Sequence, residues 1–375
     1  MSTNWPVRIA HLLVVTLVAA CGGGTSTEDA TSEGRQEALA LSRPAALTTG
    51  SLLAAASMRG FTLGERQVPA RVEADYAQAR TLYGANIERV GIALTVNSNH
   101  TAFTMPQAER DYMVAAVANG KKYGFKVVLT ITAGSTGDNQ EIWGNASLQN
   151  SLATIWAGIA TQFKGNQVIA GLELLNEPVE PRHRTGQTWN NTLPDEWRPL
   201  SILLINAIRA VDPSVPIVWM PSPWGQPDRF WSGFNNPIAT LPGGNIVYSV
   251  HVYEPATATG QGINGNPPNV TYPAAGADLA YIVGRLQYVK DFGAINHTPI
   301  FVGEFGFNRH SPAGSREAWF TDTAALFESY GWNYAAHAFR NWEGWDTEIG
   351  PDPETVRRPD APIITILKNK FSANR

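Results

Sequence analysis

The stretch Gly-Leu-Glu-Leu-Leu-Asn-Glu-Pro at residues 171–178 decides how the rest of this sequence is interpreted. A largely apolar run over 168–175 ends abruptly in Asn176, Glu177 and Pro178. A short apolar run that stops at a breaker is typical of a buried β-strand. Parallel α/β folds gather their chemistry at the carboxyl ends of their strands. Asn176 and Glu177 are therefore candidate functional residues.

A second stretch, Ile-Phe-Val-Gly-Glu-Phe-Gly at residues 300–306, repeats the pattern of an apolar strand followed by a carboxylate, here Glu304. Glycoside hydrolysis needs such a pair, because one carboxyl group protonates the leaving oxygen while the other attacks or activates water. The alternative is that either glutamate caps a helix or pairs with a basic residue. Two strand-end glutamates, each within a distinctive flank, favour catalysis.

Strand and helix patterns alternate along the chain from residue 58. Strands are predicted over 58–63, 85–92, 126–132, 168–176, 216–220, 245–251, 300–304 and 333–339. Helices are predicted over 71–83, 106–123, 147–163, 195–211, 278–292, 315–330 and 355–371, with a weak helix around 230–236. Eight strand–helix units over about 310 residues predict an α/β fold, a (β/α)8 TIM barrel. A doubly wound sheet is the alternative.

The first residues have the features of an export signal. Arg8 precedes an apolar run over 12–20, and Cys21, the only cysteine, follows Val-Ala-Ala. This pattern resembles a bacterial lipoprotein signal peptide, in which the cysteine receives a diacylglycerol. An ordinary secretory signal is the alternative. We therefore predict a signal peptide at 1–20, a lipidated Cys21 with a flexible polar linker at 21–52, and a catalytic domain at 53–375.

Composition limits the partners of the chain. A hydrophobic content of 43% indicates a folded domain, and a net charge of −4 argues against a nucleic-acid partner. Gly22, rather than Asp, follows the cysteine, which favours the outer membrane or cell surface over the inner membrane. A secreted or periplasmic protein is the alternative. We expect a monomer that contacts the membrane only through its N-terminal lipid.

The motifs at 175–178 and 302–306 together resemble glycoside hydrolase family 5, a cellulase-like family of clan A, and the similarity extends from about residue 59 to residue 342. The resemblance implies that Glu177 is the acid/base and that Glu304 is the nucleophile. It also implies that Asn176 hydrogen-bonds the 2-hydroxyl of the sugar, a contact that strengthens in the transition state.

Three further residues match the family pattern. Arg89 corresponds to an arginine of the second strand, and a guanidinium beside Glu304 would keep that carboxylate ionised at neutral pH. A structural salt bridge is the alternative for Arg89. His251 and Tyr253 correspond to a His-x-Tyr motif of the sixth strand, and their spacing places both side chains on one face. We expect Tyr253 to donate to Glu304, and His251 to contact substrate or tune Glu177.

The sequence departs from the family pattern at two strands. The third strand ends in Thr-Ala-Gly at 132–134, where many family members have a histidine. At the eighth strand His337 occupies the usual position of a tryptophan, and Trp342 and Trp345 are displaced into the loop. We expect Trp342 or His337 to supply a contact to the sugar at the cleavage point. Four tryptophans of predicted rim loops, which either bind sugar or pack the loops, are Trp143, Trp189, Trp224 and Trp231.

These residues predict a retaining endo-β-glycosidase that cleaves β-1,4-linked polysaccharide, most simply a β-glucan, without cofactor or metal. The alternatives are the same chemistry on mannan, xyloglucan or oligosaccharides, or a non-catalytic surface lipoprotein that binds glycans. The retaining mechanism requires the pKa of Glu177 to lie above that of an exposed glutamate, and the pKa of Glu304 below it. The two carboxyl groups should be about 5–5.5 Å apart.

Overall fold

The structure is a computed structural model that describes residues 57–63, 72–134, 139–183, 193–232, 236–263 and 266–374. The predicted signal peptide at 1–20, Cys21 with its linker, and Trp189 lie outside the described residues. None of the helices within these ranges is long and apolar enough to span a membrane.

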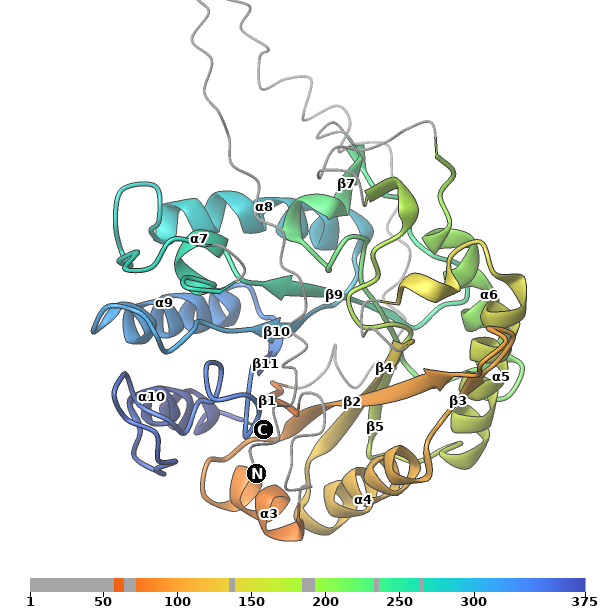
Figure 1. The fold of residues 1–375 in the computed structure, drawn as a ribbon, viewed down its shortest axis with the longest axis horizontal. Coiled ribbons are helices and arrows are strands. Elements are labelled where there is room, and N and C mark those ends of the chain that lie inside the picture. Colours follow the sequence, from red (N-terminus) through yellow and green to blue (C-terminus); the bar gives the residue numbers. More distant parts are fainter. Residues whose placement is uncertain are drawn as a thin grey trace, which may run out of the picture.

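Parallel strands form a closed barrel, which confirms the predicted (β/α)8 TIM barrel and excludes the doubly wound sheet (Figure 1). The ring closes because β1 pairs in parallel with both β2 and β11. The barrel strands are β1 (Arg59–Leu63), β2 (Ile87–Val96), β4 (Lys126–Ala133), β5 (Ile169–Glu173), β6 (Ile217–Trp219), β9 (Ile246–Val252), β10 (Ile300–Phe305) and β11 (Asn333–Ala336).

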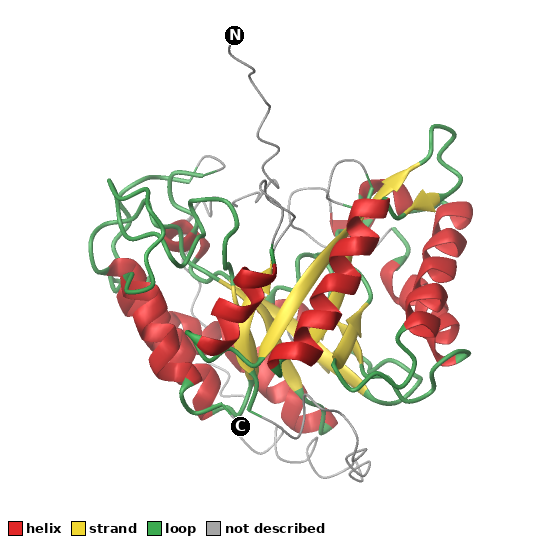
Figure 2. Cartoon of the chain, turned by 90° about the horizontal axis from the view of Figure 1, so that it is seen from below, coloured by secondary structure: helices red, strands yellow, loops and turns green. Residues whose placement is uncertain are grey.

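Helices cover the outside of the barrel (Figure 2). They are α3 (Glu73–Thr81), α4 (Gln107–Tyr123), α5 (Ala146–Gln162), α6 (Trp197–Arg209), α8 (Leu279–Asn296), α9 (Ser315–Ser329) and α10 (Pro362–Phe371). The connections contain β3 (Phe103–Thr104), which pairs antiparallel with β2, the short helix α7 (Ala256–Thr259), and the 3₁₀ turns η1 (Gln140–Ile142) and η2 (Pro181–His183).

Two predicted helices differ from the structure. The weak helix expected around 230–236 is wrong, because a 3₁₀ turn, η3 (Pro227–Phe230), leads into the small hairpin of β7 (Trp231–Ser232) and β8 (Asn236–Pro237). Glycine, asparagine and proline in this segment are poor helix formers. The last helix begins at Pro362 rather than near residue 355. Pro359 lacks the N–H that a helix interior needs, whereas a proline suits the first turn.

Polar side chains and a glycine mark the helix ends. Asn145 accepts a hydrogen bond from the backbone N–H of Leu148 at the start of α5, and Asp278 accepts one from Tyr281 at the start of α8. Gly124 ends α4 in the left-handed conformation, with φ at 77°. These residue types satisfy backbone groups that a helix terminus leaves without partners.

The barrel has two separate apolar cores. The larger one fills the space between the strands and the surrounding helices. The smaller one lies inside the barrel. Met58, which directly precedes β1, contributes to it, and each of the other seven barrel strands contributes one residue: Ile87, Val128, Ala170, Val218, Val247, Phe301 and Ala335. Since side chains alternate along a strand, the next inward-facing layer, towards the carboxyl ends, contains Arg89. The active-site candidates therefore lie on a packed apolar floor.

Candidate active site

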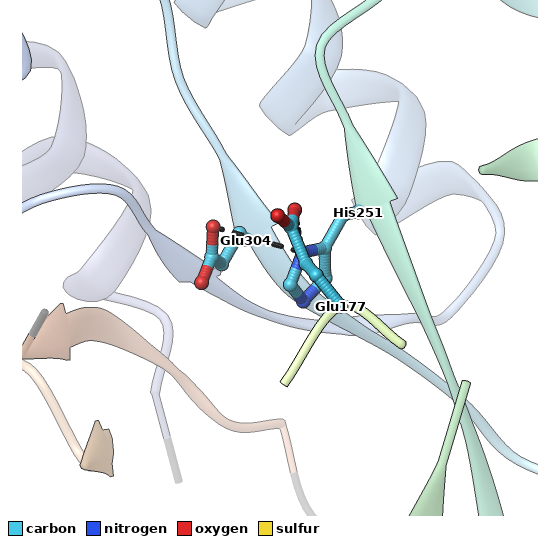
Figure 3. Close-up of side chains that lie close together, drawn as sticks. All are labelled: Glu177, His251 and Glu304. Atoms are coloured by element: carbon cyan, nitrogen blue, oxygen red, sulfur yellow. Dashed lines mark hydrogen bonds and ion pairs between the residues drawn. The ribbon is translucent and has the colours of Figure 1, made fainter. Parts of the chain in front are cut away.

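Glu177 and Glu304 meet at the carboxyl ends of the barrel strands. Glu304 lies in β10 and Glu177 follows β5, while His251 lies between them on β9, and the three side chains point towards one another (Figure 3). A carboxylate oxygen of each glutamate and one ring nitrogen of His251 all lie within 4.8 Å of one another. The structure thus brings these three predicted site residues together, and their roles stay predictions.

Both oxygens of Glu304 are held by hydrogen bonds. Arg89 Nη1 donates to Oε1 over 2.6 Å, and the Tyr253 hydroxyl donates to Oε2 over 2.8 Å. The side chain of Glu304 is only 10% exposed. The contacts expected of Arg89 and Tyr253 are therefore present, and they fix the carboxylate in one orientation.

The surroundings of Glu304 favour its ionised form. Burial on its own raises the pKa of this carboxyl group, but nearby histidines, Arg89 and the hydrogen bond from Tyr253 outweigh burial and lower the pKa to about 2. Arg89 is the permanent cation among these groups. Its own pKa is lowered by burial but raised more by its carboxylate neighbours. Glu304 is therefore ionised at neutral pH, as a nucleophile must be.

Glu177 has the opposite tendency. Burial raises the pKa of its carboxyl group, and the contact to His251 opposes this only in part. Oε1 of Glu177 lies 2.8 Å from His251 Nδ1, and the side chain is 20% exposed. The backbone of Glu177 is in the left-handed region with φ at 42°, a conformation that non-glycine residues adopt at a cost of about 1–3 kcal/mol. The expected opposite pKa shifts of the two glutamates are thus present in the structure.

Arg89 organises the floor of the site through three different nitrogens. Nη1 binds Glu304, Nη2 donates to the side-chain oxygen of Asn176 over 2.7 Å, and Nε donates to Glu173 over 2.6 Å. Because Arg89 occupies the oxygen of Asn176, the amide nitrogen is the part of Asn176 left to donate to a substrate hydroxyl.

Gly303 makes room for Arg89. A Cβ atom at this position would lie 2.6 Å from Ser249 Oγ, 3.1 Å from His251 Nε2 and 3.3 Å from Arg89 Nε. The strand carries a register irregularity between Val302 and Glu304 that makes Gly303 the extra residue. Glu304 can therefore face His251 while the guanidinium packs beneath it.

His337 follows β11 and completes the ring around Glu304. Its Nδ1 lies 3.8 Å from Glu304 Oε2, and burial lowers the pKa of the imidazole more than Glu304 raises it. Trp345 is the tryptophan beside these groups, with ring centroids 5.5 Å from Tyr253 and 6.0 Å from His337. Trp342 is one step further out, since its ring lies 6.4 Å from that of Trp345. The aromatic contact to the sugar expected of Trp342 stays a prediction.

The tryptophans of the rim loops have different surroundings. Trp143 is 9% exposed and packs edge-on against Trp197, which favours loop packing over sugar binding. Trp231 donates through Nε1 to the backbone oxygen of Tyr288 and is partly buried. Trp224 is also only partly buried, and its backbone is left-handed with φ at 55°.

Two structural contributors escaped the sequence analysis. Asn139 links the ends of two neighbouring strands, because its side chain accepts from Ala133 N over 2.6 Å and donates to Asn176 O over 2.7 Å. Glu173, fully buried, holds Arg89 from inside the barrel. A charged residue within an otherwise apolar strand is the signal that could have identified Glu173.

The cluster of Glu177, His251 and Glu304 is also the group of donor atoms in the described ranges that is tight enough to hold a metal ion. Arg89 already supplies a positive charge to Glu304 over 2.6 Å, and Tyr253 occupies the other oxygen. These contacts fit a pair of reacting carboxyl groups better than they fit a cation site, which is rich in unpaired carboxylates.

Comparison with known proteins agrees with this chemistry. The model of the family cellulase (glycosyl hydrolase family 5) matches residues 55–349. Endoglycoceramidase I of Rhodococcus hoagii (strain 103S) is 31% identical over 120 residues, which are 30% of this chain and 24% of that protein. An endoglucanase of Paenibacillus polymyxa is 25% identical over 200 residues, which are 49% of this chain and 45% of that protein. The chain thus matches less than half the length of either curated relative.

Solved structures share the fold at low identity. Thermotoga maritima Cel5A in complex with cellobiose has a TM-score of 0.66 at 17% identity, and the match covers 83% of this chain and 96% of that one. The same enzyme in complex with mannotriose has a TM-score of 0.62 at 18% identity, and covers 83% and 97% of the two chains.

Proposed function

The chain belongs to glycosyl hydrolase family 5, and from this premise we propose that it is a retaining enzyme that cleaves β-1,4-linked polysaccharide internally, most simply a β-glucan. In the first step Glu304 attacks the anomeric carbon, and protonated Glu177 gives its proton to the departing glycosidic oxygen. In the second step Glu177, now ionised, takes a proton from water, and the hydroxide so formed displaces Glu304. The proton on Glu177 is thereby restored.

One observation carries the proposal: two carboxyl groups with opposite pKa shifts lie next to each other in a single cluster. Their nearest oxygens are within 4.8 Å. Retaining glycosidases place these groups about 5–5.5 Å apart, whereas inverting enzymes leave about 6.5–9.5 Å to accommodate a water molecule. The contact between the two groups is in keeping with the retaining spacing, and the lowered pKa of Glu304 supports its role as the nucleophile.

The proposed substrate class is drawn from proteins to which the chain is similar. The endoglucanase relative supports a β-glucan. The mannotriose complex of Cel5A supports mannan as an alternative, and the endoglycoceramidase relative supports the same chemistry on a glycolipid. Xyloglucan, shorter oligosaccharides and a non-catalytic glycan-binding role remain outcomes of the test.

Export belongs to the same proposal. We place the enzyme at the outer membrane or cell surface as a monomer, anchored by a lipid on Cys21. Labelling cells with a tagged fatty acid tests this, because wild-type protein should carry the label and the Cys21→Ser variant should not. Label-free wild-type protein in the culture medium would support the secretory alternative.

The test of function is release of reducing ends from a panel of β-glucan, mannan, xyloglucan and glycolipid. The first product anomer, followed by NMR, should retain the β configuration, and an inverted product would overturn the mechanism. Glu304→Gln should lower the rate about 10⁴-fold or more, because it removes the nucleophile. Glu177→Gln should lower it about 10²–10⁴-fold. Near-full activity in either folded variant would contradict the assignment, and binding without turnover in wild type would favour the glycan-binding alternative.

A further inference from the structure

A third carboxylate, Glu173, binds the same arginine as the reacting Glu304. It ends β5, its side chain is fully buried, and Oε2 accepts from Arg89 Nε over 2.6 Å. Its other oxygen, Oε1, is buried without a hydrogen-bond partner in the described part of the chain. Buried polar atoms nearly always have partners, so a half-satisfied carboxylate at this position requires an explanation.

We propose that Glu173 is a positioning residue of the active site, which orients Arg89 towards Glu304 and Asn176 and divides the charge of that arginine between two carboxylates. This inference rests on the proposed function, because it assigns Glu173 a part in the proton chemistry of Glu177 and Glu304.

The orientation of Arg89 depends on Glu173. A guanidinium is a planar fork, so a bond to Nε fixes the directions of both Nη groups. With Nε held by Glu173, Nη1 meets Glu304 over 2.6 Å and Nη2 meets Asn176 over 2.7 Å. The loss of the bond to Glu173 would let the plane rotate and release both contacts.

The charge of Glu173 also limits how far Arg89 can favour ionisation of its neighbours. Among the described residues, Arg89 is the one permanent cation in direct contact with Glu304, and it also acts electrostatically on Glu177. While Glu173 shares this cation, ionisation of both Glu177 and Glu304 would leave three negative charges around one arginine. Like charges at short range disfavour ionisation, so the arrangement favours a proton on Glu177.

Other groups around Glu177 and Glu173 do not replace this effect. Glu177 faces His251 from β9, Tyr253 from the residue after that strand, Glu304 from β10, and Arg89 from β2. The register partners of Glu173 on the neighbouring strands β4 and β6 are Thr130 and Val218, neither of which titrates. Removal of the Glu173 charge should therefore act mainly through Arg89.

The decisive variant is Glu173→Gln, which keeps an oxygen for Arg89 Nε but removes the charge. Carbon-13 NMR of labelled glutamate carboxyl groups, with the Glu177 signal assigned from Glu177→Gln, measures protonation in wild-type and variant protein without any turnover. We expect the pKa of Glu177 to fall by about half a pH unit or more in Glu173→Gln, because Arg89 then acts more fully on both reacting carboxylates. The basic limb of kcat/KM on an aryl cello-oligosaccharide should move to lower pH by the same amount.

Glu348→Gln is the matched control. Glu348 is 1% exposed and accepts from Arg340 Nε over 2.7 Å, so this substitution also removes a buried charge beside an arginine. It should lower the melting temperature and leave the Glu177 titration unchanged.

Glu173→Asp separates charge from reach, since it keeps the charge but shortens the side chain. The pKa of Glu177 should stay close to its wild-type value. The value of kcat should fall, because the shorter side chain displaces Arg89. An unchanged titration in folded Glu173→Gln, or equal shifts in the Gln and Asp variants, would overturn the proposal. If Glu173→Gln does not fold, the Asp variant alone decides. A shifted Glu177 titration in Glu173→Asp would then overturn the proposal, whereas a wild-type titration with a lowered kcat would support it. Failure of the proposed function is distinct, because wild-type protein would then cleave no glycan while the NMR result still stands.

Discussion

Two arginines of this molecule have the same kinds of partner, namely two carboxylates and one side-chain amide. The partners of Arg89, inside the barrel, are Glu173, Glu304 and Asn176. The partners of Arg340, on the segment after β11, are Asp75, Glu348 and Gln78. We refer to the first set with its arginine as the barrel network and to the second as the seam network, because the latter joins the end of the barrel to α3.

The networks differ in how completely their carboxylates are satisfied. In the seam network Glu348 Oε1 accepts from Tyr83 over 2.6 Å and from Gln78 over 2.9 Å, while Oε2 accepts from Arg340. In the barrel network Glu173 Oε1 has no partner among the described residues, and Glu304 keeps 10% of its side chain exposed. A network whose carboxylates are all hydrogen-bonded stabilises one conformation, whereas the barrel network leaves part of Glu304 exposed where a substrate can reach it.

Replacing each arginine by lysine is the most direct test of whether the two networks have different functions. Arg89→Lys should lower kcat/KM about 10²–10³-fold, because an ammonium group cannot bind three partners in fixed directions at the point where charge changes during reaction. Arg340→Lys should leave kcat/KM within about twofold and destabilise the fold by about 1–2 kcal/mol, because lysine keeps the charge but loses hydrogen bonds of the guanidinium group. Steady-state kinetics and denaturant unfolding of both variants measure these effects.

Equal losses of activity in the two lysine variants would show that both networks act through overall stability. The comparison would then be wrong. Circular dichroism at the assay temperature controls for this, since a folded Arg89→Lys protein with lost activity separates the two explanations.

The pH dependence of kcat/KM tests the opposite pKa shifts of Glu304 and Glu177. Glu304, with its pKa lowered to about 2, is ionised over nearly the whole working range, so the acid limb of kcat/KM should lie well below the ordinary glutamate pKa. Glu177, with its pKa raised, must stay protonated, so the basic limb should lie above the ordinary value. Activity should fall about tenfold per pH unit beyond either limb.

The linkage to stability has opposite signs for the two groups. The stabilisation from Glu304 is complete above its unfolded-state pKa and is lost as the pH falls towards about 2. Glu177 binds its proton more tightly when folded, so its contribution is present at low pH and is lost as the pH rises through its raised pKa. An acid limb at or above the ordinary glutamate pKa would contradict the assigned roles.

Most of the barrel network was predicted from the sequence, because Asn176 and Glu304 lie at the ends of apolar strands and Arg89 matches the family pattern of the second strand. Parallel strands bring their carboxyl ends to one mouth, so Asn176 and Glu304 were expected to lie together. Glu173 was missed because β5 carries a register irregularity opposite Val127 and Val128, which breaks the alternation by which inward positions are identified.

The seam network and the aromatic side of the site depend on segments without periodicity. Arg340, Trp345 and Glu348 lie on the long connection after β11, where no strand or helix pattern determines direction. Contacts of such segments depend on tertiary packing, so one sequence does not specify them. The same limit explains why Trp345, rather than Trp342, lies beside Tyr253 and His337.

A smaller effect should follow when the space around Arg89 is filled. Gly303→Ala introduces a Cβ atom 2.6 Å from Ser249 Oγ and 3.3 Å from Arg89 Nε, so it should displace the arginine and lower kcat/KM about tenfold. The double variant Gly303→Ala with Ser249→Ala should regain part of that loss, because the closest clashing atom is removed. Gly158→Ala, in α5 with nothing within 4 Å, should instead stabilise the fold by about 0.5–1 kcal/mol without affecting activity.

The smallest expected effect is a change in KM when Trp345 or Trp342, the tryptophans near the barrel network, is replaced by alanine. Trp345→Ala should raise KM about three- to tenfold with little change in kcat, because aromatic contacts contribute about 0.5–1.5 kcal/mol and Trp345 touches Tyr253 rather than Glu304. Trp342→Ala should change KM less, since its ring reaches the site only through Trp345. Trp231→Ala serves as a rim control, with lowered stability and unchanged KM expected from its bond to Tyr288 O. A larger KM change in Trp342→Ala than in Trp345→Ala would show that Trp342 is the tryptophan that contacts the sugar. The sugar contact would then lie further from the barrel network.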